Sequence, residues 1–410
     1  MTNAKSTLLT ATLLCLPLLD LAASPAEDGW STGLDVTLEG SAGLSGGADQ
    51  GQSLHGLALV HADWKQPGKP AEGLNYMGYV SALALSGKGP TEKFLGDFLA
   101  TSNIEGYQSV RLYAWWLETS WHDWSLRSGV LLADEEFAGS EAGGNFFNSA
   151  FGWPAFISAN TVNTGPAFYV AAPGLRLERK WSETGAWRLG IYDGDSFDSP
   201  AGDPRITRHG LHYRVGGNQG WFLITEATFA PADGATRCKV GAWLHTASFA
   251  DVRDDKTGQP FALTGNDPRQ HGSNHGTYVV IEHTVAGESG KPGNIEFFVR
   301  SGFAPSDRNA ISWALDTGFG WTGLIPGRPA DVAALGLAHA RFGSYFADAA
   351  RLTDPANPAP DFEQAIEFAY AINLSAHLTI QPDLQFIRHP GGSPAQRDAF
   401  LFHLRVSTSF

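Results

Sequence analysis

Apolar and polar residues alternate along short segments of this chain, which is the pattern of β-strands. In the segment 362–374, for example, Ile366 and Phe368 share one parity, whereas Glu363 and Glu367 share the other. A helix would instead repeat its apolar positions every three to four residues, and beyond residue 30 no such repeat is sustained. The pattern therefore predicts an all-β protein.

Sixteen segments show this alternation, separated by stretches rich in Gly, Pro, Asn and Asp. They are 33–44, 54–64, 74–85, 110–119, 124–133, 174–181, 187–193, 220–230, 238–249, 276–285, 294–303, 311–322, 331–342, 362–374, 376–388 and 399–410. A weaker run lies at 211–215. Lengths of about 10 residues suit strands that cross a membrane at a tilt.

The connections between these segments alternate between short and long. The short ones include 120–123, 182–186, 231–237, 286–293 and 375, and the long ones include 86–109, 134–173, 194–219, 250–275 and 343–361. Short turns at one end and long loops at the other are typical of outer-membrane barrels, which have even strand numbers in single bacterial chains. Assigning 211–215 to a loop preserves the alternation, so we predict a 16-stranded antiparallel transmembrane β-barrel with short periplasmic turns and long extracellular loops.

A charged face opposite an apolar face also fits a soluble sandwich, in which the apolar face is the core. The tryptophans favour the barrel, because many lie near strand ends, where aromatic girdles meet the membrane surface. They are Trp64, Trp115, Trp116, Trp121, Trp124, Trp181, Trp187, Trp221 and Trp321. The last strand also closes on Phe410, an aromatic residue of the kind that outer-membrane assembly machinery is expected to read.

The first residues resemble a secretory signal peptide. Lys5 precedes the uncharged run 7–19, and small residues follow near Ala23. We expect cleavage after Ala23, with Ala26 as the alternative, which leaves 24–410 as a single barrel domain. Cys238 is then the only cysteine, so no intramolecular disulfide is possible.

Composition agrees with this architecture. The chain has 48 Gly, 17% charged residues and a formal net charge of −14. The glycines suit turns and close-packed walls, and the low charge follows if half of each strand faces lipid. A nucleic-acid partner is not expected, because it would require a clustered basic face.

Several short motifs, taken in order, resemble the carbohydrate-selective porins of the OprB type. They are Asn103-Ile104-Glu105, Arg111-Leu112-Tyr113, Trp116-Leu117-Glu118, Asn148-Ser149-Ala150-Phe151-Gly152, Leu189-Gly190-Ile191-Tyr192-Asp193-Gly194 and Glu226. The resemblance implies a monomeric barrel through which small sugars, glucose especially, diffuse passively across the outer membrane of a Gram-negative bacterium. Outer-membrane lipid and lipopolysaccharide would surround such a barrel.

The loop 134–173 is the longest, at 40 residues, and it is rich in phenylalanine. We expect it to fold into the barrel and narrow the pore, the alternative being a loop packed over the mouth. A sugar offers hydroxyls to Arg and Glu and a C–H face to aromatic rings. The candidate constriction residues are Arg111, Tyr113, Asn148, Phe151, Trp153, Arg176, Glu178, Arg188 and Glu226.

Neither catalysis nor a metal or other cofactor is expected. Glu135 and Glu136 are adjacent and would point apart on a strand, so they make a poor acid–base pair for glycoside hydrolysis. The acids between Asp193 and Asp203 lack EF-hand spacing, and His271 and His275 lie in a Gly/Asn-rich loop without an HExxH frame. The alternative to a porin is a secreted, soluble all-β carbohydrate-binding protein or glycosidase.

Overall fold

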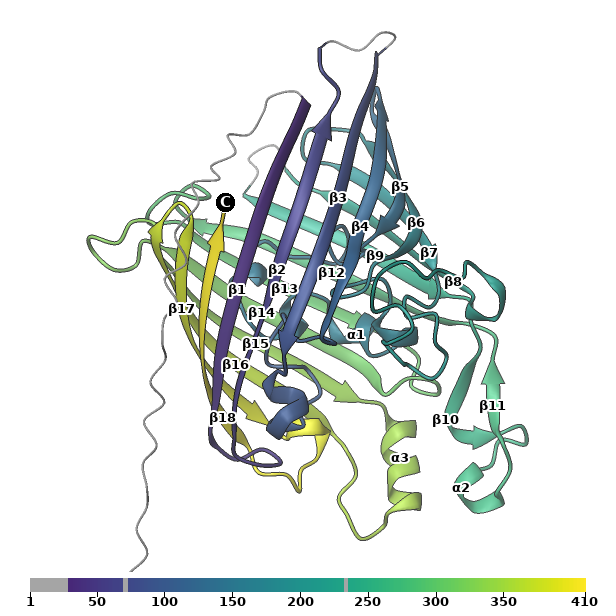
Figure 1. Cartoon of the computed structure of the whole chain (residues 1–410). Helices are drawn as coiled ribbons and strands as arrows, with labels where there is room; N and C mark the ends of the chain where they lie inside the picture. The colour runs from purple at the N-terminus through teal and green to yellow at the C-terminus, as the bar shows by residue number, and fades with distance from the viewer. Residues whose placement is uncertain (1–28, 69–72, 232–234) are drawn as a thin grey trace, which may run out of the picture.

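The computed structural model describes residues 29–68, 73–231 and 235–410 (Figure 1). The expected signal peptide, 1–23, lies outside the described residues. Within the described ranges, no helix combines the length and apolar character needed to cross a membrane.

Sixteen antiparallel strands form one closed barrel, in which each strand pairs with its neighbour and β1 pairs with β18. The barrel strands are β1 (Gly29–Ser45), β2 (Gln52–Lys65), β3 (Leu74–Gly87), β4 (Ser109–Trp121), β5 (Trp124–Leu131), β6 (Ala172–Lys180), β7 (Ala186–Asp193), β8 (Trp221–Phe229), β9 (Thr236–His245), β12 (Asn274–Ala286), β13 (Ile295–Phe303), β14 (Ile311–Thr322), β15 (Val332–Phe342), β16 (Phe362–Ser375), β17 (Leu378–Arg388) and β18 (Ala399–Ser409). Every predicted segment overlaps one of them, and 211–215 lies in a loop, so the predicted 16-stranded barrel is confirmed.

The long loops lie at one end of the barrel and the short turns at the other (Figure 1). We number the loops L1 (46–51), L2 (88–108), L3 (132–171), L4 (194–220), L5 (246–273), L6 (304–310), L7 (343–361) and L8 (389–398). L5 carries a hairpin of β10 (Phe249–Asp255) and β11 (Pro268–His271) and the short helix α2 (Phe261–Thr264), and L7 carries α3 (Ser344–Thr353).

The wall has an apolar outer face and a polar inner face. On β16, Ile366 and Phe368 are 37% and 46% exposed, whereas Glu363 and Glu367, at positions of the opposite parity, are fully buried. Side chains alternate across a strand, so the exposed set faces outward and the buried acids face the interior. Large apolar side chains recur on the outer face of most strands, as a barrel surrounded by lipid requires.

L3 packs against the inner wall, and its phenylalanines are buried there. Phe146 and Phe151 stack at 4.3 Å between ring centroids, and both contact Phe298 of β13. A Cβ atom at Gly336 of β15 would meet the rings of Phe146 and Phe151 at 2.8 Å. Glycine at this wall position therefore permits the close approach of the loop.

Inward-facing charged side chains bind the backbone of L3. Arg300 of β13 is buried, donates to the carbonyl oxygens of Ala138 (2.7 Å), Gly152 (2.9 Å) and Ala150, and pairs with Asp316 of β14 at 3.1 Å. Glu367 of β16 accepts from the backbone N–H groups of Phe147 and Asn148 at 2.5 and 3.0 Å. Two points of the inner wall, three strands apart in the barrel, thus hold the loop.

The Arg300 contacts give a stability prediction. In Arg300→Leu, Asp316 loses its cation and three L3 carbonyls lose their donor, and removing one partner of a buried pair costs about 3–5 kcal/mol. We expect the folded, heat-modifiable band on gels to convert to the unfolded band at a markedly lower temperature. Arg179→Leu, on an exposed arginine of β6, is the control and should melt like wild type. Equal melting of both variants would contradict the assigned role of Arg300.

Candidate pore lining

L2, L3 and the inner wall enclose a cavity of about 730 Å³. L3 supplies several lining residues between Asp134 and Tyr169, and L4 supplies Phe197. The residues from L2 are Phe98, Leu99, Ala100, Asn103, Ile104 and Glu105. Leu57 of β2 and Arg405 of β18 represent the barrel wall. The volume lies within the ~300–1,000 Å³ typical of small-molecule sites.

The lining combines flat aromatic surfaces with a few polar groups. The aromatic residues are Phe98, Trp153, Phe168, Tyr169 and Phe197, and the hydrogen-bonding side chains include Asn103, Glu105, Asp134 and Arg405. Trp153 is held in place because its Nε1 donates to the carbonyl oxygen of Thr164 at 2.8 Å. Aromatic faces beside carboxyl, amide and guanidinium groups suit a ligand with hydroxyls and an apolar C–H face.

Arg405 is the arginine of the cavity lining, and its guanidinium is held in one orientation by several contacts. Its Nε and Nη2 donate to Glu39 Oε2 at 2.9 and 2.6 Å, Nη2 also donates to Asn103 Oδ1 at 2.8 Å, and the guanidinium lies 3.8 Å from the ring centroid of Phe147. Closure of the barrel makes this possible, because Glu39 and Arg405 face each other in the β1–β18 register. The planar fork is thereby fixed before any ligand arrives.

Sequence reasoning did not select Arg405 as a site residue. The available signal was its parity, since Arg405 and His403 alternate with Phe402, Leu404 and Val406 in the last strand. What was missing was its partner, Glu39, which lies in the first strand at the other end of the chain.

Glu105 of L2 is the carboxyl group with a strongly altered ionisation. Its Oε1 accepts from the backbone N–H and the hydroxyl of Thr91 at 3.3 and 3.1 Å. Burial and, second to it, the nearby carboxylate of Asp97 together raise the pKa of Glu105 to about 8. At neutral pH the group is therefore largely protonated and can donate a hydrogen bond as well as accept one.

A second polar cluster links L3 to the four neighbouring strands β4 to β7. Glu136 of L3 contacts Arg127 of β5 at 2.6 Å and Arg176 of β6 at 2.9 Å. Glu118 of β4 pairs with the same two arginines, at 2.9 and 2.6 Å. Glu178 and Arg188 form the next pair, at 2.5 Å. We call this set the Arg–Glu ladder, in which three arginines face three glutamates and the charges cancel.

The structure divides the nine predicted site residues into groups. Arg176, Glu178 and Arg188 come together in the Arg–Glu ladder. Glu226 of β8 is opposite Arg188 in the β7–β8 register, but its carboxylate accepts from Ala138 N–H at 2.8 Å and from the hydroxyl of Tyr278 at 2.9 Å.

Arg111 and Tyr113 of β4 pack against the end of L3. Arg111 donates to the carbonyl oxygen of Tyr169 at 3.3 Å, and Tyr113 meets Phe168 edge-on at 6.5 Å. Both are nearly fully buried and line a small separate pocket rather than the large cavity.

The three predicted L3 residues behave differently from one another. Asn148 is buried, donates to Gln385 Oε1 at 3.3 Å and accepts from Ala150 N–H at 3.1 Å, and Phe151 stacks within the buried aromatic group. Of the nine, Trp153 alone lines the large cavity. Most of the predicted residues therefore position L3.

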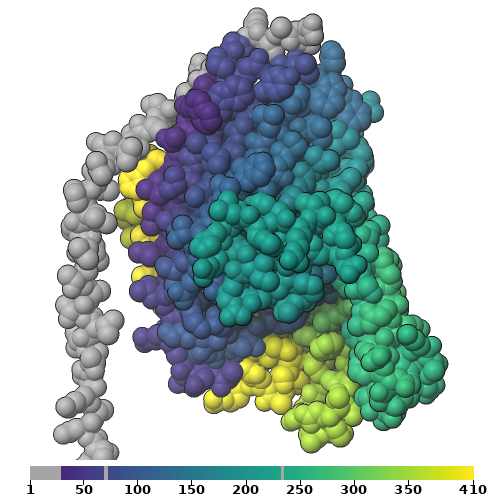
Figure 2. Space-filling model, turned by 45° about the vertical axis from the view of Figure 1, so that its right-hand side comes forward, coloured from purple at the N-terminus to yellow at the C-terminus, as the bar shows by residue number. Residues whose placement is uncertain are grey.

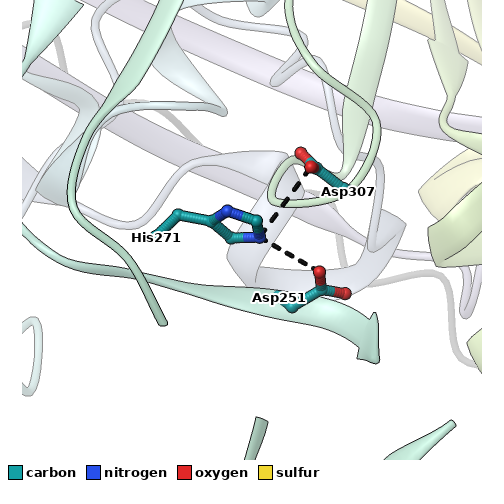
Figure 3. A group of neighbouring side chains, drawn as sticks. All are labelled: Asp251, His271 and Asp307. Atoms are coloured by element: carbon teal, nitrogen blue, oxygen red, sulfur yellow. Dashed lines mark hydrogen bonds and ion pairs between the residues drawn. The ribbon is translucent and has the colours of Figure 1, made fainter. Parts of the chain in front are cut away.

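Asp251, His271 and Asp307 form the group that by residue type and spacing could bind a cation (Figure 3). His271 Nε2 lies 3.0 Å from Asp251 Oδ2 and 3.8 Å from Asp307 Oδ2. Asp251 already accepts from Arg269 at 2.6 Å and from two backbone N–H groups, and Arg308 pairs with Asp307 at 2.9 Å. The carboxylate oxygens of Asp251 and Asp307 thus already accept from donors of the protein. The group is therefore better described as a set of polar contacts that joins L5 to L6.

The acidic side chains of L4 accept hydrogen bonds from L4 and from the adjoining L3. Asp195 accepts from Asn163 Nδ2 at 2.6 Å and from the N–H groups of Phe197 and Ser199, and Asp198 accepts from Arg214 N–H at 2.8 Å. Their carboxylates organise the turn instead of presenting a ligand cage.

Comparison with known proteins identifies relatives. The sequence model of the carbohydrate-selective porin family, OprB, matches residues 75–410. Porin B of Pseudomonas aeruginosa is 26% identical over 418 residues, which cover 94% of this chain and 88% of that protein. The high-pH structure of Pseudomonas putida OprB superposes with a TM-score of 0.80 at 21% identity, covering 93% of this chain and 94% of that one. The outer-membrane channel DcaP of Acinetobacter baumannii shares the fold at a TM-score of 0.55 and 12% identity, over 95% and 100% of the two chains.

The Arg–Glu ladder predicts a change in ion preference. Glu136→Gln keeps the side-chain shape but leaves one arginine charge uncompensated beside the lumen. A unit charge at about 4 Å in water is worth about 1 kcal/mol, so the anion-to-cation permeability ratio should rise by up to about fivefold. Reversal potentials in a potassium chloride gradient measure this. Glu183→Gln, on an exposed glutamate in the short connection between β6 and β7, should leave the ratio unchanged, and an unchanged ratio in Glu136→Gln would refute the assignment.

Glu105 predicts a pH dependence. Because its pKa is raised to about 8, raising the pH from 6.5 to 9.5 converts a neutral cavity group to an anion, and cation preference should increase with a midpoint near pH 8. Glu105→Gln should lack this step, whereas Glu92→Gln, an exposed acid of the same loop, should retain it. Persistence of the full step in Glu105→Gln would assign the titration to another group.

Proposed function

We propose a path for sugars through the barrel, starting from the family of the protein. The chain belongs to the carbohydrate-selective porin family OprB and is a sugar porin of the Gram-negative outer membrane. The secreted, soluble alternative is not supported. With the family established, the loop end of the barrel is its extracellular end.

The observation that carries the proposed path is the chemistry of the large cavity. It places Arg405, fixed by Glu39 and Phe147, beside Asn103, Glu105 and a set of aromatic rings. The two Nη1 donors of Arg405 form no hydrogen bond with the described part of the chain, so they are available to sugar hydroxyls. We propose that a monosaccharide such as glucose binds here weakly and passes on by passive diffusion, because conduction requires release as well as entry.

L3 is the proposed constriction, and the sequence-predicted residues shape it. In this proposal Trp153 contacts the sugar directly. The other eight act on the pore by holding L3 or the wall beside it, as Asn148 does through Gln385 and Glu226 does through Ala138. The Arg–Glu ladder adds polar groups to the path without adding net charge, which suits an uncharged substrate.

A purely conducting role, without catalysis, completes the proposal. Of the adjacent acids Glu135 and Glu136, Glu136 is engaged by Arg127 and Arg176, so these two do not provide the pair of free carboxyl groups that glycoside hydrolysis requires. We also propose that 1–23 are removed on export and that a single chain of 24–410 forms the channel. Phe410 continues the β1–β18 pairing, with its N–H donating to the carbonyl oxygen of Leu34 at 2.9 Å, and we propose that this end is read during assembly.

Arg405 is the decisive test of the sugar path. In Arg405→Ala the cavity loses charge-assisted donors, each worth about 1.5–3 kcal/mol, so the glucose concentration that half-blocks single-channel conductance should rise at least about tenfold. Arg405→Lys keeps the charge opposite Glu39 but loses the planar fork, and it should show a smaller weakening with the barrel intact.

Arg397→Ala, on an exposed arginine of L8, is the matched control and should be blocked like wild type. Heat-modifiable migration of each variant establishes that the barrel has folded. Wild-type block by glucose in both folded Arg405 variants would overturn the assignment of the sugar path.

A further inference from the structure

L4 covers a part of the barrel wall that the strands leave open. β5 pairs with β4 only from Trp115 onward, since L3 turns inward after Leu131, so the extracellular part of β4 lacks a partner on that side. L4 takes its place, with Leu112 N–H donating to the carbonyl oxygen of His209 at 3.0 Å. In Figure 2 the teal atoms of L4 lie against the blue atoms of the early strands, on the side of the barrel.

The fold holds this part of L4 firmly. Gly210 has a φ of +63°, and a Cβ atom there would meet the carbonyl oxygen of Leu112 at 1.8 Å, so the tip of the loop is seated on the strand. Tyr213 points toward the Arg111 pocket, and Asp198 and Asp193 accept from the backbone N–H groups of Arg214 and Gly216 at 2.8 and 3.0 Å. Thr207 is also buried at that pocket, and the other side chains of 205–215 are exposed.

The outward side of this segment is unusually apolar for a loop. Leu211 and Val215 are 73% and 58% exposed, and Val110 on the adjoining part of β4 is 67% exposed. Val110 belongs to the outward face of β4, which faces lipid, and Leu211 follows Gly210, which contacts Leu112 of the same strand. They lie at the extracellular end of the strand and are therefore level with the outer leaflet.

Basic groups flank these apolar side chains. Arg208 and Arg214 are exposed, and no carboxylate of the described residues lies within ion-pair distance of either. Arg208 donates only to the neighbouring His209, at 2.9 Å, and Arg205 is already paired with Asp203. In a chain of net charge −14, these two arginines form a local positive surface that would attract an anion.

We propose that the surface formed by Val110, Arg208, Leu211, Arg214 and Val215, which we call the L4 patch, binds lipopolysaccharide of the outer leaflet. The guanidinium groups would bind its phosphates, for which arginine is well suited, while the apolar side chains contact its acyl chains. A free anion would explain the arginines but not the apolar side chains. Binding would seal the part of the wall that L4 replaces. The inference rests on the outer-membrane location and is independent of the sugar path.

The test compares binding of purified lipopolysaccharide to detergent-solubilised protein, with dephosphorylated lipopolysaccharide as a second probe. In Arg208→Ala/Arg214→Ala the affinity for the intact lipid should fall at least tenfold. Arg351→Ala/Arg397→Ala removes the same charge from exposed arginines of L7 and L8 and should bind like wild type. Leu211→Ser/Val215→Ser should weaken binding of both lipids.

Three results would overturn the proposal. They are wild-type affinity in the folded Arg208/Arg214 variant, equal affinity of wild type for intact and dephosphorylated lipid, and full competition by millimolar inorganic phosphate. Heat-modifiable migration confirms folding of each variant. Glucose block of conductance should remain at its wild-type value in the Arg208/Arg214 variant, so a failure of the sugar path would be recognised separately.

Discussion

The whole molecule depends on one constraint, which is that hydrocarbon cannot hydrogen-bond to an exposed backbone. A sheet in lipid must therefore close, and here it closes where β1 pairs with β18. Closure also creates the chemistry of the pore, because it brings Glu39 of the first strand against Arg405 of the last. The same register that satisfies the backbone thus fixes the most firmly oriented cation of the cavity.

L3 interrupts the pairing of the wall on one side of β4, and another loop compensates for the interruption. The loop leaves the wall after Leu131 and is held inside by Arg300 and Glu367, in the position from which we propose that it narrows the pore. Its departure leaves part of β4 without a strand partner, and L4 supplies the missing acceptor through His209. Constriction inside and the L4 patch outside are therefore two consequences of one loop turning inward.

The strands could be predicted because the environment of each strand is visible in its own sequence, where apolar residues that face lipid alternate with polar residues that face the lumen. Ile366 and Glu367 could be assigned to opposite faces without any knowledge of their neighbours. The Arg–Glu ladder was partly predictable for the same reason, since Arg176, Glu178 and Arg188 have inward parity on adjacent strands. Glu136, which completes the ladder, was not, because a loop residue has no parity and its partners depend on the path of L3.

The sequence by itself determined the all-β class, the sixteen strands, their faces and the family, since these follow from periodicity and from short motifs. Only the tertiary structure decided what each inward-facing side chain does. Arg405 lines the large cavity, whereas the side chain of Arg300, which also points inward, uses its donors to bind the backbone of L3. The physical reason is that an inward-facing side chain can bind a solute only through donors that the described residues of the protein do not already occupy, such as Nη1 of Arg405, and the groups that occupy the other donors are distant in sequence.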